Sequence, residues 1–360
     1  MTEKRNQHYI PKFYLRKFSY RANEKQIGLF NVKTGFFFPT ATLKHQGSKD
    51  FFYGADGVIE EGLSIIEGKL AESLKKIIIE RKVPTKLSKE HINLLVFVGL
   101  THLRNPVIIQ NMKDLFKTAQ LRAQELDPEL DVTKHFPEIS HEDAIKMSLS
   151  GVSEVVSYMA DLDVKLLINR TKIPFITSDF PVVKYNQYLE LKKWDHGKTG
   201  YGNTGLQIII PLNDELSILL YDGLIYNVGD KKKNYLGINK EKDVKKLNML
   251  QLLNCLETVY FNEKISEPQM KELSEMASKF KRANEMQSTL HYISDGKIPF
   301  QPKKENLIVS GSTELEVDLK IAGISVHAFG KAQKLSNTMA QLRPVPLQLM
   351  RERDRNKANY

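Results

Sequence analysis

The sequence has little cysteine, with Cys255 as the single residue of this type among 360. One cysteine excludes an internal disulfide, and no pair of histidines has the helical spacing of a metal site. No uninterrupted apolar run approaches the length that spans a bilayer, and no apolar signal core follows the charged start MTEKRNQHYIPKF. These absences predict a protein that has no membrane helix and works in a reducing cytoplasm.

A complete catalytic or cofactor motif is also absent. The segment 196–205, HGKTGYGNTG, contains Gly-Lys-Thr, but a phosphate-binding loop needs a glycine five residues before Gly197, where the chain has Lys192. The four glycines of this segment favour a mobile loop or lid instead of a nucleotide site.

The charge of the chain is strongly positive. A net charge of +10 and a pI near 9.3 predict a polyanionic partner, DNA or RNA. A solvated surface explains each basic cluster alone, whereas three clusters together favour nucleic-acid binding. The clusters are Lys4, Arg5, Lys12, Arg16, Lys17 and Arg21 near the start, Lys231 to Lys233, and Arg343, Arg351, Arg353, Arg355 and Lys357 in the tail.

The hydrophobic patterns predict an α+β fold, in which a helical N-terminal half packs on a mixed β-sheet contributed mainly by the C-terminal half. Apolar residues at steps of three and four predict helices over 58–82, 88–103, 107–125, 140–160, 241–254 and 267–285. Shorter β-rich runs predict a hairpin of 26–32 with 36–42, and strands at 206–211, 216–221, 224–228 and 257–261.

A polar linker, DPELDVTKHFPEI, is the predicted boundary between two closely packed parts. The first part is 1–125, an N-terminal segment with a hairpin and helices, and the second is 140–300, a helix with the mixed-sheet region. The remainder, 301–360, is predicted to form a hairpin around Gly311, a short helix and a basic tail.

The stretch 166–185, LLINRTKIPFITSDFPVVKY, is the predicted centre of the sheet. Residues 166–168 and 173–177 are predicted to be partner strands around a turn, after which Asp179 follows at a sheet edge and Pro181 restricts the exit. Asp179 is either a functional carboxylate or a residue that satisfies nearby backbone N–H groups.

Two glutamates, Glu60 and Glu67, lie seven residues apart on one predicted helix, which stacks both carboxylates beside the apolar stripe. Together with Asp179 and His8 they are candidate ligands for Mg²⁺ or Mn²⁺, which prefer oxygen ligands. The alternative is a buried polar network in which Arg104 neutralises a glutamate.

Five ordered segments resemble the bacterial domain-of-unknown-function family 4238, over about residues 7–262. They are HYIPKFYLRKF, DFFYG, IEEGLSIIE, LRNP and FITSDFPV. The resemblance implies no settled activity, and the sequence departs from the family pattern at Phe180, where a small polar residue is more usual. By residue, the resemblance points to His8, Tyr9, Glu60, Glu67, Arg104, Ser178 and Asp179.

Two functions follow as hypotheses. In the first, the protein is a metal-dependent nucleic-acid-processing enzyme, such as a nuclease of phage defence or a toxin-type nuclease. Its carboxylates would hold the metal, Tyr9, Arg104 and Ser178 would bind phosphate, and His8 would move a proton. In the second, the protein is a non-catalytic ligand-binding or regulatory protein, whose polar cluster is structural. An enzyme requires these side chains to meet at an open cleft, with His8 and Asp179 within reach of one ligand.

Overall fold

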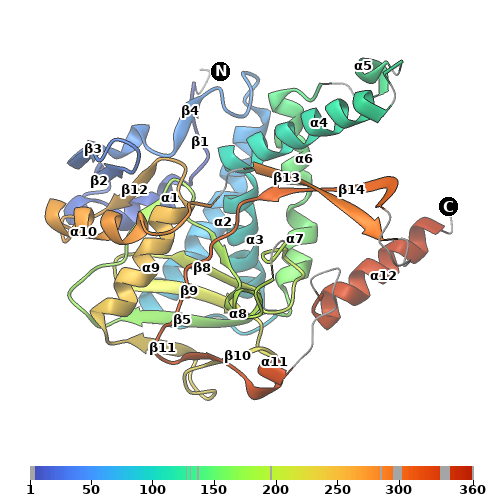
Figure 1. Ribbon diagram of the computed structural model, residues 1–360. Helices are drawn as coiled ribbons and strands as arrows, with labels where there is room; N and C mark the ends of the chain where they lie inside the picture. The colour runs from blue at the N-terminus through green and yellow to red at the C-terminus, as the bar shows by residue number, and fades with distance from the viewer. Residues whose placement is uncertain are drawn as a thin grey trace.

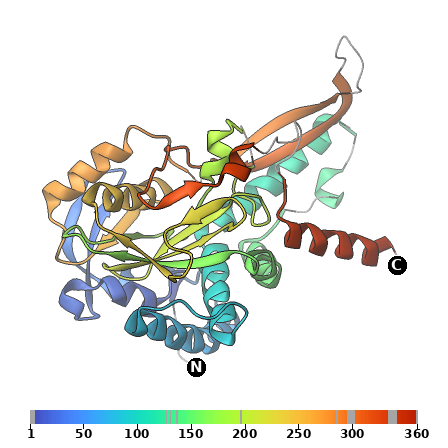
Figure 2. The ribbon, with the colours of Figure 1, turned by 90° about the horizontal axis from the view of Figure 1, so that it is seen from below.

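The computed structural model describes residues 5–358, apart from 127, 130, 136–137, 195–196, 284–285, 295–301 and 333–340. Helices pack against two sheets in the body, and a long hairpin and the C-terminal helix extend from it (Figures 1 and 2). The predicted α+β class is therefore confirmed.

The larger sheet has five strands in the order β11-β5-β9-β8-β7. Only β11 and β5 pair in parallel, so the sheet is mixed. Every residue of β8 and β9 is buried, which explains their nearly continuous apolar sequences. The strands are β5 (Asp163–Asn169), β7 (Val183–Tyr185), β8 (Gln207–Pro211), β9 (Leu216–Tyr221) and β11 (Tyr235–Ile238).

The smaller sheet joins the two halves of the chain, in the order β3-β2-β12-β6. Its first two strands are the predicted hairpin, which pairs through β2 with β12 from the second half. The bounds are β2 (Gln26–Asn31), β3 (Phe37–Thr42), β6 (Thr177–Ser178) and β12 (Thr258–Phe261).

Helices of the first half cover the larger sheet, as predicted. Leu94 and Phe97 of one helix share a hydrophobic cluster with Leu166 of β5 and Ile218 of β9. This cluster spans both sides of the predicted domain boundary. The helices before β5 are α2 (Val58–Glu80), α3 (Lys89–Leu103), α4 (Pro106–Leu126), α6 (His141–Ser150) and α7 (Val152–Met159). The second half adds α9 (Glu241–Asn254) and α10 (Glu267–Ala277), which belong to a second hydrophobic cluster.

Two helix predictions need correction. The stretch 140–160 forms two helices, because the Gly151 N–H bonds to Ser148 O at 3.2 Å in a tighter turn that ends α6. The helix predicted over 267–285 ends at Ala277. By contrast, α3 begins as predicted, because Ser88 Oγ accepts the His91 N–H at 3.2 Å.

The predicted pairing of 166–168 with 173–177 is wrong. Strand β5 pairs with β9 and β11, and only the last residues of the second run form a strand, β6, which pairs with β12. Pro174 has no N–H to donate to a ladder. The Asn248 side chain of α9 takes the place of a strand, since it accepts the Ile176 N–H at 3.1 Å and donates to Pro174 O at 2.9 Å.

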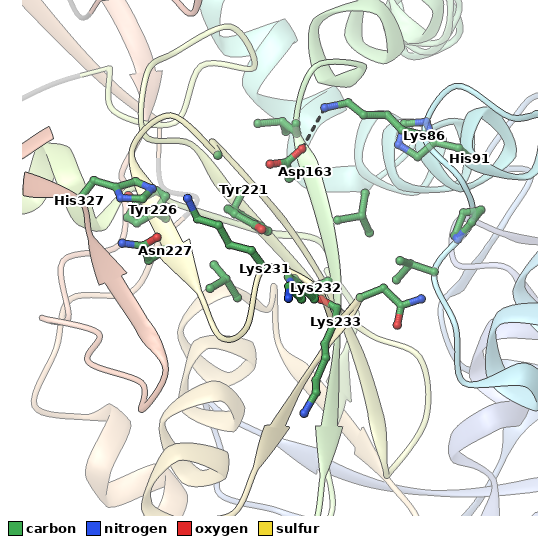
Figure 3. Close-up of a pocket in the computed structure, with 18 residues that line it drawn as sticks. Lys86, His91, Asp163, Tyr221, Tyr226, Asn227, Lys231, Lys232, Lys233 and His327 are labelled. Carbon is green, nitrogen blue, oxygen red and sulfur yellow. Dashed lines mark hydrogen bonds and ion pairs between the residues drawn. The ribbon is translucent and has the colours of Figure 1, made fainter. Parts of the chain in front are cut away.

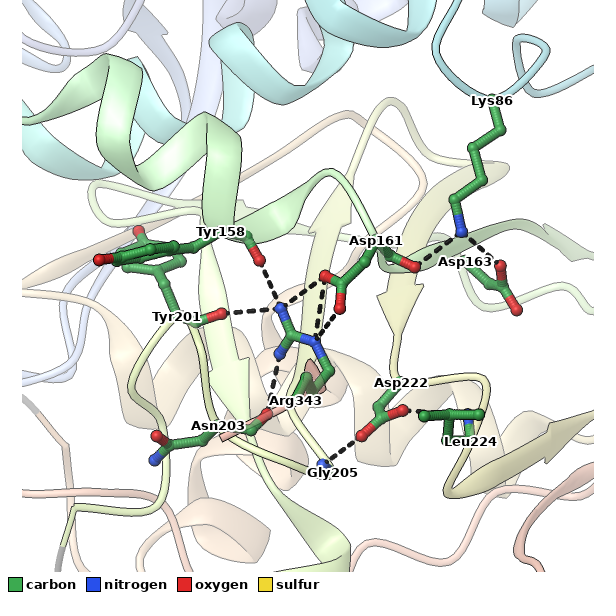
Figure 4. Close-up of polar contacts among 10 residues, drawn as sticks. All are labelled: Lys86, Tyr158, Asp161, Asp163, Tyr201, Asn203, Gly205, Asp222, Leu224 and Arg343. Atoms are coloured by element: carbon green, nitrogen blue, oxygen red, sulfur yellow. Dashed lines mark hydrogen bonds and ion pairs between the residues drawn. The ribbon is translucent and has the colours of Figure 1, made fainter. Parts of the chain in front are cut away.

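Hydrogen bonds from Arg343 hold the glycine-rich segment that the sequence predicts to be a mobile loop (Figure 4). The Arg343 guanidinium donates to Asn203 O at 2.8 Å and to Tyr201 O at 2.9 Å. It also pairs with Asp161 at 2.9 Å, and Arg343 is only 2% exposed. The prediction that Arg343 belongs to a solvated basic tail is therefore wrong.

The C-terminal hairpin is formed by β13 (Met286–Ser294) and β14 (Pro302–Ser312). Gly311 lies within β14 and not at a turn, and the connection between the strands is outside the described residues. Two helices follow, α11 (Ala328–Ala332) and α12 (Pro344–Ala358).

Within the described residues, no single helix is long and apolar enough to cross a membrane. By length and composition alone, α3 and the first part of α4 pass this test as a pair bent by 57°.

Candidate functional site

Three of the seven predicted site residues line one pocket of about 540 Å³. His8 enters it from β1 (Asn6–His8), which pairs with β4 (Ser48–Asp50), while Glu60 and Glu67 enter it from α2. We call this the His8 pocket; it is lined by Arg5, Asn6, His8, Lys12, Lys44, Glu60, Leu63, Ser64 and Glu67.

The His8 imidazole is held in one orientation and is 7% exposed. Its ring bonds to the Lys44 backbone, and its Nε2 has no partner among the described residues. A backbone carbonyl accepts, so the ring proton lies on Nδ1, and the buried Nε2 carries the lone pair. Burial, with a smaller effect of Lys12, lowers the pKa of His8 to about 4. The imidazole is therefore neutral at pH 7.

Arg104 lies behind this wall, at the C-terminus of α3, and is completely buried. Its NH1 contacts Glu67 Oε1 at 2.7 Å. Burial acts to lower the pKa of Arg104, but Tyr53 and Glu67 outweigh it and raise the pKa above its usual value. The predicted alternative, in which Arg104 neutralises a glutamate, is thus present and involves Glu67.

Asp179 is 3% exposed and is turned toward the backbone before β12. Its Oδ1 accepts the Leu256 N–H at 2.7 Å, and its Oδ2 accepts the N–H groups of Glu257 and Thr258, both at 2.8 Å. Burial raises the pKa of Asp179 to about 6, although these three hydrogen bonds act to lower it. The carboxylate satisfies backbone donors, but they are distant in sequence and not those of its own turn.

Ser178 and Tyr9 are also buried in contacts of the fold. The Ser178 hydroxyl donates to Gln251 Oε1 of α9 at 2.7 Å. The Tyr9 ring lies 5.6 Å from the Phe52 ring, and neither Tyr9 nor Ser178 lines the His8 pocket. The predicted phosphate-binding role has no support from these positions.

The predicted metal site does not fit this arrangement. Across the part of the chain that the structure describes, no group of three or more His, Cys, Asp or Glu side chains is placed to hold a metal ion. Glu67 is paired with Arg104, and Asp179 lies outside the pocket with three N–H partners. Glu60, Glu67 and Asp179 are therefore not brought together, and His8 and Asp179 do not share a pocket.

The segments that carry the family resemblance contact one another in the fold. The Tyr53 hydroxyl donates to His8 O at 3.1 Å, and Tyr14 and Thr177 share a hydrogen bond of 2.6 Å between their hydroxyls. Asn105, beside Arg104, donates to Asp179 O at 2.7 Å.

A family model described as "Protein of unknown function (DUF4238)" matches residues 6–265. The chain belongs to this family. The match confirms the resemblance over about 7–262 and includes every residue that lines the His8 pocket except Arg5. No curated protein and no solved structure matched the chain.

Lys44 and Ser64 line the pocket of this DUF4238 chain but were missed by sequence reasoning. Ser64 follows Glu60 by four residues, so its place on the same helix face was available from the spacing. Lys44 lies in a short 3-10 turn, η3 (Leu43–His45), and no pattern in the sequence marks it.

Proposed function

We propose that the protein is a nucleic-acid-processing enzyme that hydrolyses phosphoesters in the His8 pocket, with His8 as the proton acceptor. The observation that carries this proposal is the His8 Nε2 lone pair, which is buried and without a partner among the described atoms that surround it. A buried polar atom without a partner is costly to a fold, and such atoms concentrate where a ligand or reactant completes the contact.

The chemistry requires no group beyond water and substrate. Nε2 takes a proton from water while the water oxygen bonds to phosphorus and the ester oxygen leaves; the proton is then returned to that leaving oxygen. The ring bond to the Lys44 backbone holds Nε2 in place during the transfer. A bound phosphate favours the protonated imidazole, which moves the pKa of His8 up from about 4 toward the working pH.

The basic residues at the pocket support a polyanionic substrate. Arg5, Lys12 and Lys44 line it, in a chain whose net charge is +10. Glu67 is neutralised by Arg104, and Glu60 is a second carboxylate in the lining.

The test is cleavage of single- and double-stranded DNA and RNA by the purified chain, with and without Mg²⁺ or Mn²⁺. His8→Gln keeps a polar side chain but removes the basic nitrogen, so we expect cleavage to fall by about 10²–10⁴-fold. His45→Gln is the matched control, because His45 is exposed and does not line the pocket. A wild type without cleavage, or a His8→Gln variant with full cleavage, overturns the proposal.

A second candidate is a non-catalytic ligand-binding or regulatory protein. It is favoured by Arg104, Ser178 and Asp179, which are buried and engaged in contacts of the fold. Growth separates the two candidates. A toxin- or defence-type nuclease arrests cells on induced expression and loses this effect in His8→Gln, whereas a binding protein has no such dependence on the Nε2 base.

A further inference from the structure

A second pocket, of about 470 Å³, lies at the end of the larger sheet beside β10 (Tyr226–Val228) and the loop that leads to β11 (Figure 3). None of its lining residues also lines the His8 pocket. We call it the lysine pocket, because its wall includes Lys86, Lys165 and Lys231 to Lys233.

The lining of the lysine pocket has a strong excess of positive charge. Asp163 is its single carboxylate, and Lys86 Nζ contacts Asp163 Oδ1 at 3.0 Å, so these two charges compensate one another. Four further lysines remain in the lining. Like charges gathered around one cavity repel one another and are stabilised by an anion in that cavity.

The lysine-bearing loop is fixed by a buried cation. Lys165 of β5 is 5% exposed, and its ammonium donates to Asp230 O at 2.8 Å and also to Lys233 O. The Lys232 N–H donates to Asp230 Oδ1 at 2.9 Å. The loop backbone is therefore held in one shape while the side chains of Lys231, Lys232 and Lys233 are exposed. A fixed loop loses little entropy when it binds a ligand.

His91 supplies an independent sign of a ligand. It is completely buried and lines the pocket, and its Nδ1 accepts the Leu87 N–H at 3.2 Å. The ring proton therefore lies on Nε2, which has no partner among the described atoms. A buried N–H donor without a partner, on a residue that lines a basic pocket, is suited to an anionic oxygen.

We propose that the lysine pocket binds a small phosphate-bearing anion of the nucleotide or pyrophosphate class. Lys231, Lys232 and Lys233 neutralise the phosphate oxygens, and the His91 Nε2–H donates to one of them. The volume of about 470 Å³ lies within the usual range for small-molecule sites. Tyr221 and Tyr226 give the same pocket an aromatic wall, which suits a nucleotide base.

The test is calorimetric titration of the full chain with inorganic pyrophosphate, with adenosine triphosphate and with a short single-stranded oligonucleotide. We expect both small anions to bind, with affinity that falls as salt rises. The triple variant Lys231→Ala/Lys232→Ala/Lys233→Ala is expected to bind them at least about 10-fold more weakly, since it removes three charge-assisted contacts to phosphate. The matched control is Lys242→Ala/Lys279→Ala/Lys281→Ala, which removes the same charge from exposed positions outside both pockets.

His91→Asn provides a second measurement. Asparagine places an acceptor near the position of Nδ1, so the Leu87 contact is retained while the Nε2 donor is removed. We expect severalfold weaker pyrophosphate binding by His91→Asn. If this variant does not fold, the triple lysine variant alone decides the test. No binding by the wild type, equal loss in the control triple, or binding of the oligonucleotide alone overturns the proposal. His8→Gln leaves pyrophosphate affinity unchanged, so failure here is distinct from failure of the cleavage experiment.

Discussion

Asp179→Asn is the substitution that best tests how the Thr-Ser-Asp segment is used. If Asp179 were a catalytic carboxylate, this change would abolish activity at constant stability. The structure gives a different cause, because the partners of Asp179 are three backbone N–H groups at 2.7–2.8 Å, and Arg104 pairs with Glu67.

The magnitude follows from the donors that the substitution leaves without acceptors. Asparagine keeps one acceptor oxygen, which can serve the N–H groups of Glu257 and Thr258. Its amide nitrogen then faces the Leu256 N–H, so two buried donors oppose one another. Each buried donor without a partner costs about 1–3 kcal/mol, and the expected loss in the free energy of unfolding from the two is roughly 2–6 kcal/mol.

The assay is urea unfolding of wild type and Asp179→Asn at neutral pH, with Asp50→Asn as the control. Asp50 makes an exposed pair with Arg5, and removal of its charge is expected to cost less than about 1 kcal/mol. Nucleic-acid cleavage by folded Asp179→Asn is expected to stay near that of the wild type. A variant of unchanged stability whose cleavage collapses would refute the structural role and return Asp179 to the catalytic set.

Three further predictions concern the neighbourhood of the His8 pocket. Arg104→Met leaves the Glu67 carboxylate without its buried partner and is expected to cost about 3–5 kcal/mol in urea unfolding, against less than about 1 kcal/mol for Lys146→Met in an exposed helix pair. The pKa of His8 is about 4 in the folded chain and 6.5 in the unfolded chain, so the unfolded chain binds a proton first as pH falls. The contribution of His8 to the free energy of unfolding is therefore fully present above about pH 6.5 and is lost as pH falls toward 4. The free energy of unfolding of His8→Gln should therefore fall by roughly 3 kcal/mol less than that of the wild type over this pH range. Parallel curves of unfolding free energy against pH for the two proteins would contradict the lowered pKa of His8. Binding of labelled DNA or RNA is expected to weaken steeply with salt, and absence of binding at low salt in an anisotropy titration would contradict both the polyanion prediction and the nuclease proposal.

Periodic patterns made much of the helical half predictable. The apolar stripe from Ile59 to Ile77 fixes α2, and Ser88 marks the start of α3 by accepting a backbone N–H in its first turn. The strongly apolar runs that became β8 and β9 were equally clear. Local chemistry decides these elements, so a single sequence is enough to locate them.

Partners between distant segments were not predictable in the same way. Asn248 replaces a strand partner for Pro174 and Ile176, and Asp179 serves donors at 256–258, all more than 70 positions away. Their side chains can make these contacts in many folds, so residue type alone does not choose among them. The same holds for Arg104, which had Glu60 and Glu67 as candidate partners in the sequence and pairs with Glu67.

The contacts that the polar site residues make within the fold determine which substitution tests the enzyme hypothesis. A side chain whose donors and acceptors are already used by the fold has little capacity left for a reactant, and this describes Asp179 and Ser178. Arg104 pairs with Glu67 through NH1, while its Nε and NH2 have no hydrogen-bond partner among the described atoms. His8 differs, because its Nδ1 side is held by the backbone while Nε2 remains without a partner in the described surroundings. The enzyme hypothesis therefore rests on His8, and substitution of Asp179 mainly measures the fold that supports it.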